Sequence, residues 1–152
     1  MEDINIIEFQ PEYEQLVKDL VRFVLKSLGI QNKYPEINRD TDLDYILEKY
    51  KGRGRFWLAI QDKKLIGTVA IEEVDENVAK LKRMFVLPEF QGTGIGQKLF
   101  DIALNFVKEN GYKTLKLNTD KIMSRAHRFY ERNGFHRIGE DKERYFYEMN
   151  LG

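Results

Sequence analysis

Two hydrophobic periods alternate along this chain, and they divide it into strands and helices. The apolar segment 4–9 predicts a first strand, and Pro11 then opens a stretch whose apolar side chains recur at helical spacing. Those side chains are Leu16, Val17, Leu20, Val21, Val24, Leu25 and Leu28. Gly29 is a natural end for this helix, because glycine readily adopts the left-handed backbone that ends many helices.

The next segment is polar and separates this helix from a second one. Residues 31–39 contain a Tyr-Pro pair and are predicted to form a loop. Thr41 followed by Asp44 resembles a capping box for a helix that ends near Tyr50. The basic, glycine-containing segment 51–55 is predicted to be a turn.

Three strand patterns follow in close succession. Residues 56–61, 65–73 and 78–87 are rich in apolar and β-branched side chains, and the polar segments 62–64 and 75–77 separate them. Parallel neighbours would need a longer crossover, so these short connections predict an antiparallel meander.

The last third alternates between helix and strand. A helix after a glycine-rich loop ends at Asn110-Gly111, and strand 114–119, reached through it, should run parallel to strand 78–87. A short helix and two strands complete the chain, over residues 124–132, 135–138 and 144–151. The predicted fold class is α/β, with a single mixed, mostly antiparallel central sheet of about seven strands and about four helices on its two faces.

Length and composition narrow the class of protein. The 152 residues suffice for one core, so residues 1–152 are predicted to form a single domain. The 25 acidic and 25 basic side chains cancel, which argues against nucleic-acid binding through a broad basic field. Without cysteine and with two histidines, no thiolate nucleophile is available and no metal is expected. The acidic N-terminus and the lack of a membrane-length apolar run predict a cytoplasmic protein with no membrane partner.

The segment 86–96, Val-Leu-Pro-Glu-Phe-Gln-Gly-Thr-Gly-Ile-Gly, carries the strongest chemical signal. Glycines let a backbone approach a ligand closely, and the helix start that follows offers unpaired N–H groups and the positive end of a dipole. Together they predict a site for a phosphate or diphosphate. The lysine and hydroxyl of a Walker loop are absent, and the third glycine comes one residue early for a dinucleotide fingerprint. The acyl-CoA loop pattern, (Gln or Arg)-x-x-Gly-x-(Gly or Ala), fits residues 91–96 at every defined position.

Two motifs, in this order, resemble the GCN5-related N-acetyltransferase (GNAT) superfamily. The first is the loop with its lead-in at 82–90, and the second is Ala-His-Arg-Phe-Tyr-Glu-Arg-Asn-Gly-Phe at 126–135. The predicted element order extends the resemblance over nearly the whole chain. It implies the GNAT fold and the transfer of an acetyl group from acetyl-CoA to a primary amine of a small molecule or peptide. The amine would attack directly, with no covalent enzyme intermediate.

The resemblance also implies how acetyl-CoA is bound. The strands before and after the loop helix would diverge, so that the backbone of Met84 and Val86 pairs with the pantetheine arm. The Val86 N–H would then face the thioester carbonyl and stabilise the developing oxyanion. The N–H groups of residues 92–96 would hold the diphosphate. The expected cofactor-binding residues are Met84, Phe85, Val86, Gln91, Gly92, Thr93, Gly94, Ile95, Gly96 and Asn118.

Tyr130 is the expected catalytic residue. It matches the tyrosine of the family's second motif, and a phenol donates a proton without being ionised at neutral pH. The alternative is an aromatic ring that packs the helix on the sheet beside Phe129.

The general base stays open, because the chain departs from the family at two positions. Many relatives place a glutamate near the position of Lys80, and many carry asparagine at that of Met123. Glu72 and Glu73 are candidates that would act through water, although a solvated strand end is the favoured interpretation of both.

Other charged and aromatic side chains have two interpretations. His127 and His136 are predicted to be surface residues rather than bases. Arg53 and Arg55 could contact the CoA 3′-phosphate, although a solvated loop is the favoured interpretation. Four acidic side chains could steer a cationic amine, and helix capping explains the last of them without a substrate: Glu36, Asp40, Asp42 and Asp44. The pattern leaves open whether three aromatics belong to the acceptor site or to the core: Tyr34, Tyr45 and Trp57.

The sequence leaves two other functions open. One is a non-catalytic acyl-CoA-binding module of the same fold, and the other is a protein that binds nucleotide phosphates. The acceptor amine and the acyl chain length are not encoded in the motifs. Association into a homodimer through an edge strand is a further expectation.

Overall fold

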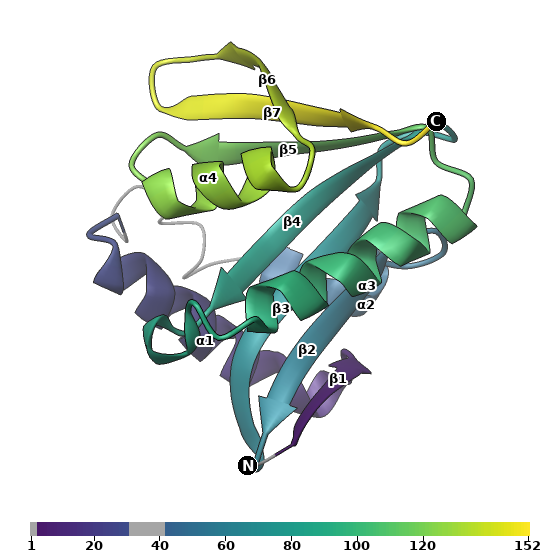
Figure 1. The fold of residues 1–152 in the computed structure, drawn as a ribbon. Coiled ribbons are helices and arrows are strands. Elements are labelled where there is room, and N and C mark those ends of the chain that lie inside the picture. The colour runs from purple at the N-terminus through teal and green to yellow at the C-terminus, as the bar shows by residue number, and fades with distance from the viewer. Residues whose placement is uncertain (1–2, 31–41) are drawn as a thin grey trace.

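The computed structural model describes residues 3–30 and 42–152, and its strands form one mixed sheet with the order β1-β2-β3-β4-β5-β7-β6 (Figure 1). The strands are β1 Ile4–Glu8, β2 Arg55–Gln61, β3 Lys64–Glu73, β4 Val78–Val86, β5 Thr114–Asp120, β6 His136–Glu140 and β7 Arg144–Asn150. The α-helices are α1 Glu14–Ser27, α2 Ile46–Lys49, α3 Ile95–Glu109 and α4 Ser124–Arg132. Short 3₁₀ turns are η1 Pro11–Tyr13, η4 Asp42–Asp44 and η5 Pro88–Phe90. The predicted mixed, mostly antiparallel sheet is confirmed.

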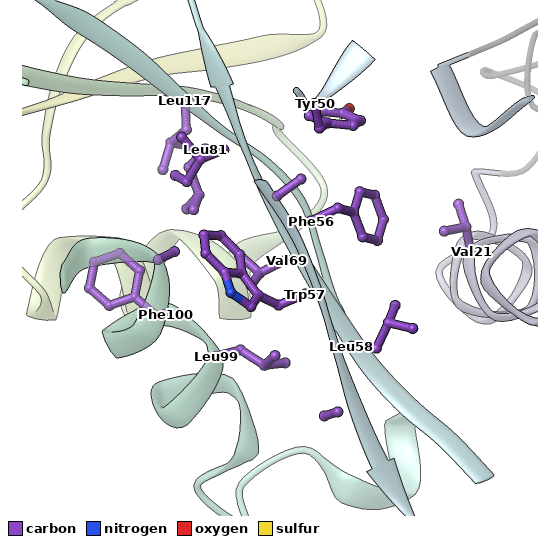
Figure 2. Packing of buried hydrophobic residues seen from close by; sticks show 14 of the residues in the cluster. Val21, Tyr50, Phe56, Trp57, Leu58, Val69, Leu81, Leu99, Phe100 and Leu117 are labelled. Carbon is purple, nitrogen blue, oxygen red and sulfur yellow. The ribbon is translucent and has the colours of Figure 1, made fainter. Parts of the chain in front are cut away.

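Helices cover both faces of the sheet, and neighbouring residues of β2 show how. Phe56 packs edge-on against Tyr50 at a centroid distance of 5.4 Å, and Figure 2 shows both rings on the side of Val21 in α1. Trp57 points to the opposite face and packs against Phe106 of α3 at 5.2 Å. Side chains alternate across a strand, so α1 and α3 bury opposite faces of the same sheet.

The first half of the sheet is the predicted meander. β2 and β3 are joined by Asp62 and Lys63, whose φ values of 49° and 66° form a left-handed two-residue turn. Such a turn matches the right-handed twist of the strands that it connects. β5 pairs with β4 in parallel, as its connection through α3 predicts.

A β-bulge in β4 separates β4 from β5. Thr68 of β3 lies opposite Phe85, whereas Ala70, two residues later, lies opposite Lys82, so β4 carries one extra residue. Arg83 has a φ of 52° within this bulge, a conformation that few side chains adopt. A bulge bends its strand and increases the local twist. β4 pairs with β5 only from Val78 to Lys80, and the remainder of this edge has no strand partner.

Several local expectations differ from the structure. Leu16 is exposed, although it falls on the apolar period of α1. Thr41 lies outside the described residues, as does the loop predicted at 31–39. α2 begins at Ile46 with Tyr45 at its N-cap, so Asp44 lies outside this helix, and it pairs with Lys18 of α1 instead. No helix of residues 3–30 and 42–152 is both long and apolar enough to cross a membrane.

Candidate active site

A cleft of about 470 Å³ opens between the glycine loop, α4 and the unpaired edge of β4. β4 and the loop supply Met84, Phe85, Val86, Gln91, Gly92, Gly94, Gly96 and Gln97 to its walls. α4 and the turn before it supply Ile122, Met123, Ser124, Arg125, Ala126, Phe129, Tyr130 and Arg132, and α1 supplies Val24 and Leu28. The structure therefore brings both sequence motifs to one cleft.

The backbone of β4 presents polar groups to this cleft. Leu87 donates its N–H to the Ile66 carbonyl of β3 at 2.9 Å. N–H groups of successive strand residues point to opposite sides, so the Val86 N–H points away from β3 and toward the unpaired edge. The Val86 carbonyl accepts a hydrogen bond of 3.1 Å from the Gln91 side chain. Gln91 thus holds the end of β4 against the loop.

The glycine loop has the conformation that its sequence predicts. Gly92 and Gly94 have φ values of 80° and 92°, and Gly94 is the N-cap of α3. A Cβ at Gly96 would lie 3.7 Å from the Val86 side chain and 3.8 Å from that of Met84, so the start of α3 packs beside β4. Amides in the first turn of a helix have no partner within it, and α3 has no acidic side chain in that turn. An anion would therefore be stabilised here.

Two loop residues keep their side chains out of the cleft, which is compatible with the expected contact through backbone N–H groups. Ile95 is 1% exposed and belongs to the core rather than to the cleft wall. The Thr93 hydroxyl donates to the Phe90 carbonyl and does not line the cleft. Only the backbone of these two residues is available for the diphosphate contact predicted for them.

Arg125 is a candidate ligand residue that the sequence reading missed. One of its guanidinium nitrogens lies 3.0 Å from the position that a Cβ at Gly92 would occupy, so it lies against the loop. It is on the first turn of α4, directly before Ala126 of the second motif. Its place directly before the second motif is the feature of the sequence that could have identified it. Gln97 was missed too, and its carboxamide donates to that of Asn133, the C-cap of α4, at 2.8 Å.

Tyr130 lines the cleft with its ring buried among Phe129, Phe135 and Tyr147. Among the described residues its hydroxyl has no hydrogen-bond partner. Burial raises the pKa of Tyr130, so the phenol keeps its proton near neutral pH. The ring makes the packing contacts of one interpretation and the residue also lines the cleft, so the catalytic role stays a prediction.

Asn118 lies outside the cleft. It is exposed on β5, two residues after Lys116, which is the last residue of β5 that pairs with β4. In the orientation that satisfies both neighbours, its carboxamide accepts a hydrogen bond of 3.1 Å from the Lys80 ammonium and donates one of 3.2 Å to the Leu117 carbonyl. Its role as a ligand residue stays a prediction.

The two candidate bases are both engaged in ion pairs. Glu72 lies 2.8 Å from the Lys49 ammonium and 3.5 Å from that of Lys82. Burial alone would raise the pKa of Glu72, but the two lysines outweigh it and hold the pKa below its usual value. Glu73 pairs with Arg53 at 2.9 Å. A carboxylate with a lowered pKa is a weak base, so Glu72 is poorly suited to proton abstraction.

An ion pair holds the β4 bulge. Arg83 donates two hydrogen bonds to the Asp42 carboxylate, at 3.0 and 2.5 Å, and the Tyr50 hydroxyl donates a third at 2.5 Å. Burial would raise the pKa of Asp42, but Arg83 and Tyr50 outweigh it and lower the pKa to about 2. The carboxylate therefore neutralises Arg83 and connects η4 to the residue that carries the strained backbone.

The other side chains weighed from the sequence do not line the cleft where the structure describes them. Arg53 donates to the Asn110 carbonyl at the C-terminal end of α3, and Arg55 pairs with Glu8 of β1. Trp57 is buried in the core, and Tyr45 is exposed. Glu36, Asp40 and Tyr34 lie outside the described residues.

His127 corrects a prediction, because it is buried and not on the surface. Its Nε2 lies 2.8 Å from the Asp120 carbonyl, and its ring packs edge-on against Tyr145. In the sequence, Arg125 and Arg128 make the segment around His127 look polar, whereas in α4 the His127 ring faces Tyr145 and Tyr147 of β7. His136 is exposed, as expected.

Comparison with known proteins gives consistent matches. The sequence model of the Acetyltransferase (GNAT) family matches residues 22–135. An N-acetylaspartate synthetase from Danio rerio is 35% identical over 89 residues, which are 58% of this chain and 32% of that protein. The chain thus spans about a third of the length of that relative.

Solved structures match over the whole chain. The crystal structure of an acetyltransferase of the GNAT family from Staphylococcus aureus Mu50 has a TM-score of 0.86 and 30% identity, with 99% of this chain and 100% of that chain covered. A PaiA N-acetyltransferase from Thermoplasma acidophilum, in complex with coenzyme A, has a TM-score of 0.87 and 21% identity over 98% and 99% of the two chains. These matches confirm the predicted fold.

Proposed function

Because the chain belongs to the acetyltransferase (GNAT) family, we propose that it is an N-acetyltransferase that transfers an acetyl group from acetyl-CoA to an amine. The observation that carries the proposal is the meeting of three features in one cleft. These are the glycine loop at the start of α3, the free edge of β4 and the side chain of Tyr130. An anion site, a strand edge and a proton donor are the parts that acetyl transfer from a CoA thioester requires.

The loop and Arg125 would hold the diphosphate of CoA. The first-turn amides of α3 and the guanidinium on Gly92 supply donors from two sides of the cleft. Charge-assisted hydrogen bonds of this kind are about twice as strong as neutral ones. The residues present therefore fit the group that the family uses.

The free edge of β4 would bind the pantetheine arm and polarise the thioester. The Val86 N–H already points to this edge, where it would donate to the thioester carbonyl as negative charge develops on the oxygen. The coenzyme supplies the activated acyl group. A hydrogen-bond donor aimed at a developing oxyanion typically contributes about a hundredfold or more to the rate.

Tyr130 would protonate the leaving sulfur. The amine nitrogen forms the new bond to the acetyl carbon, the carbon–sulfur bond breaks, and the thiolate takes the phenolic proton. The nitrogen loses its own proton to solvent, from which Tyr130 is reprotonated. The raised pKa keeps Tyr130 protonated near neutral pH, so the phenolic proton is present when the sulfur leaves.

The test is turnover. Purified protein is mixed with acetyl-CoA and a panel of amines, amino acids and peptides, and the release of free CoA is followed with a thiol reagent. Release that depends on one amine class, with a matching acetylated product by mass spectrometry, is the expected result. Tight acetyl-CoA binding without turnover of any amine would instead favour a non-catalytic acyl-CoA-binding module.

A further inference from the structure

Two arginines of α4 line the cleft, and neither has a counter-ion among the described residues. Arg125 and Arg132 are both exposed, and within residues 3–30 and 42–152 their guanidinium groups take part in no ion pair or hydrogen bond. No aspartate or glutamate of this part of the chain lines the cleft. The α4 side of the cleft is therefore positively charged and suited to an anionic ligand.

α4 aligns the two arginines along the cleft. They are seven residues apart, which is close to two helical turns, so both side chains leave the same face of α4, about 10 Å apart along its axis. Phe129 lies between them on this face and packs edge-on against Phe100 of α3 at a centroid distance of 5.8 Å. The face with both arginines is therefore turned toward α3.

The two arginines lie beside different parts of the anion site. Arg125 lies against Gly92 in the glycine loop. Arg132 is followed by Asn133, whose carboxamide accepts a hydrogen bond of 2.8 Å from Gln97 in the first turn of α3. Arg125 thus flanks the loop, whereas Arg132 lies near the helix start that follows it.

The arginines that the sequence suggested for the 3′-phosphate of CoA are engaged elsewhere. Arg53 donates to the Asn110 carbonyl at 2.7 Å, Arg55 pairs with Glu8 at 3.1 Å, and neither lines the cleft. With Arg125 assigned to the diphosphate, Arg132 is the one further cation among the described residues that line the cleft.

We infer that Arg132 binds the 3′-phosphate of CoA, and that the protein therefore selects CoA over dephospho-CoA, which lacks this phosphate. The inference rests on the proposed function and specifies its acyl donor. Six bonds along the ribose join the 5′ and 3′ phosphorus atoms, which at about 1.5 Å a bond keeps them within roughly 8 Å of each other. Two arginines that leave one helix face about 10 Å apart match this separation, since their long side chains adjust by a few ångströms. A guanidinium can also donate two parallel hydrogen bonds to one phosphate.

Calorimetric titration of CoA and of dephospho-CoA tests the inference without turnover. The two ligands share pantetheine, diphosphate and adenosine and differ in one phosphate. We expect the unmodified protein to bind CoA about tenfold more tightly at low salt, and added salt to reduce this ratio, because exposed charges are screened. Arg132→Gln should lower the ratio to about twofold or less by weakening CoA alone, and Arg132→Lys should restore part of it. Arg132 is exposed, so neither change should unfold the protein.

Two other arginines of α4 separate this effect from a general loss of charge. Arg125→Gln should weaken both ligands by a similar factor, because both carry the diphosphate. Arg128→Gln is the matched control, since Arg128 is exposed on the same helix but does not line the cleft, and it should change neither affinity. An Arg132→Gln variant that keeps the ratio of the unmodified protein would overturn the inference.

The two proposals fail in different ways. If the protein acetylates an amine but binds CoA and dephospho-CoA equally, the role of Arg132 is wrong and the acetyltransferase proposal stands. If CoA is preferred through Arg132 but no amine is acetylated, the 3′-phosphate site stands and the protein is a CoA-binding module. If neither ligand binds, both proposals are wrong.

Discussion

Tyr130 has a buried ring and yet lines the cleft. Its hydroxyl has no hydrogen-bond partner among the described residues. If its proton reaches the leaving sulfur, Tyr130→Phe should lower kcat about a hundredfold and leave KM for acetyl-CoA nearly unchanged. Steady-state kinetics across pH measure this. Tyr147→Phe is the control, because Tyr147 belongs to the same ring cluster but donates its hydroxyl to Glu131. An equal loss in both variants would assign Tyr130 to packing alone.

Asp42 gives the molecule a pH-dependent stability. Its pKa is lowered to about 2 in the folded state, so its contribution is fully present above the unfolded pKa near 4 and is lost as the pH falls toward 2. Asp42→Asn should therefore lower the free energy of unfolding by roughly 2 kcal/mol or more at pH 7, and leave Arg83 without its counter-ion. Urea unfolding at pH 7 and pH 3 measures both effects.

The control for this variant is Asp19→Asn, on the exposed side of α1. It should change the free energy of unfolding by less than about 0.5 kcal/mol at either pH. The difference between Asp42→Asn and the unmodified protein should narrow as the pH falls from 4 toward 2. A difference that stayed constant over this range would mean that Asp42 acts through shape rather than through charge.

At the scale of elements, α3 begins and ends with the same kind of glycine. Gly94 and Gly111 have φ values of 92° and 77°, and a Cβ at either would meet no atom within 4 Å. Alanine should cost each site a similar backbone strain of about 1 kcal/mol. Only Gly94→Ala alters the loop at the cleft, so it should weaken acetyl-CoA binding about tenfold or more, while Gly111→Ala leaves binding unchanged. Calorimetry supplies the affinities, and equal affinities would count against the loop as the diphosphate site.

Element periodicity explains why most of the fold could be predicted. The apolar periods of α1 and α3 and the polar turns of the meander are local signals, and the observed bounds agree with them within about two residues. The opening between β4 and β5 is not a local signal. It depends on a bulge in which Arg83, a residue with no turn propensity, is held by Asp42 from a segment 41 residues earlier. The same reasoning applies to His127, whose burial depends on packing between α4 and β7.

At the scale of the whole molecule, net charge conceals how charges gather in the fold. The chain is formally neutral, yet residues from α2, β3 and β4 bring three lysines around the Glu72 carboxylate. Lys49, Glu72 and Lys80 are far apart in sequence or separated by turns, so no window of the sequence contains the cluster. Motifs predicted the loop and Tyr130 as site residues, because each lies in a short contiguous segment of the chain. The surroundings of Glu72 are assembled by the sheet and therefore could not be predicted from one segment.

Ligand binding at the cleft should be visible in the stability of the entire domain. The loop, β4 and α4 all contact the cleft, so a ligand that joins them binds the folded state alone. At a hundredfold excess over its Kd, acetyl-CoA should add about 2.7 kcal/mol to the free energy of unfolding, and about 1 kcal/mol corresponds to 2–4 °C for a domain of this size. We therefore expect the Tm to rise by roughly 5–10 °C with acetyl-CoA in a thermal scan. ATP and NAD carry phosphates but no pantetheine arm for the free edge of β4, so at equal concentration they should give a smaller rise. A larger rise with either nucleotide would show that the loop binds phosphate groups without regard to the pantetheine arm. The proposed function would then be nucleotide binding and not acetyl transfer.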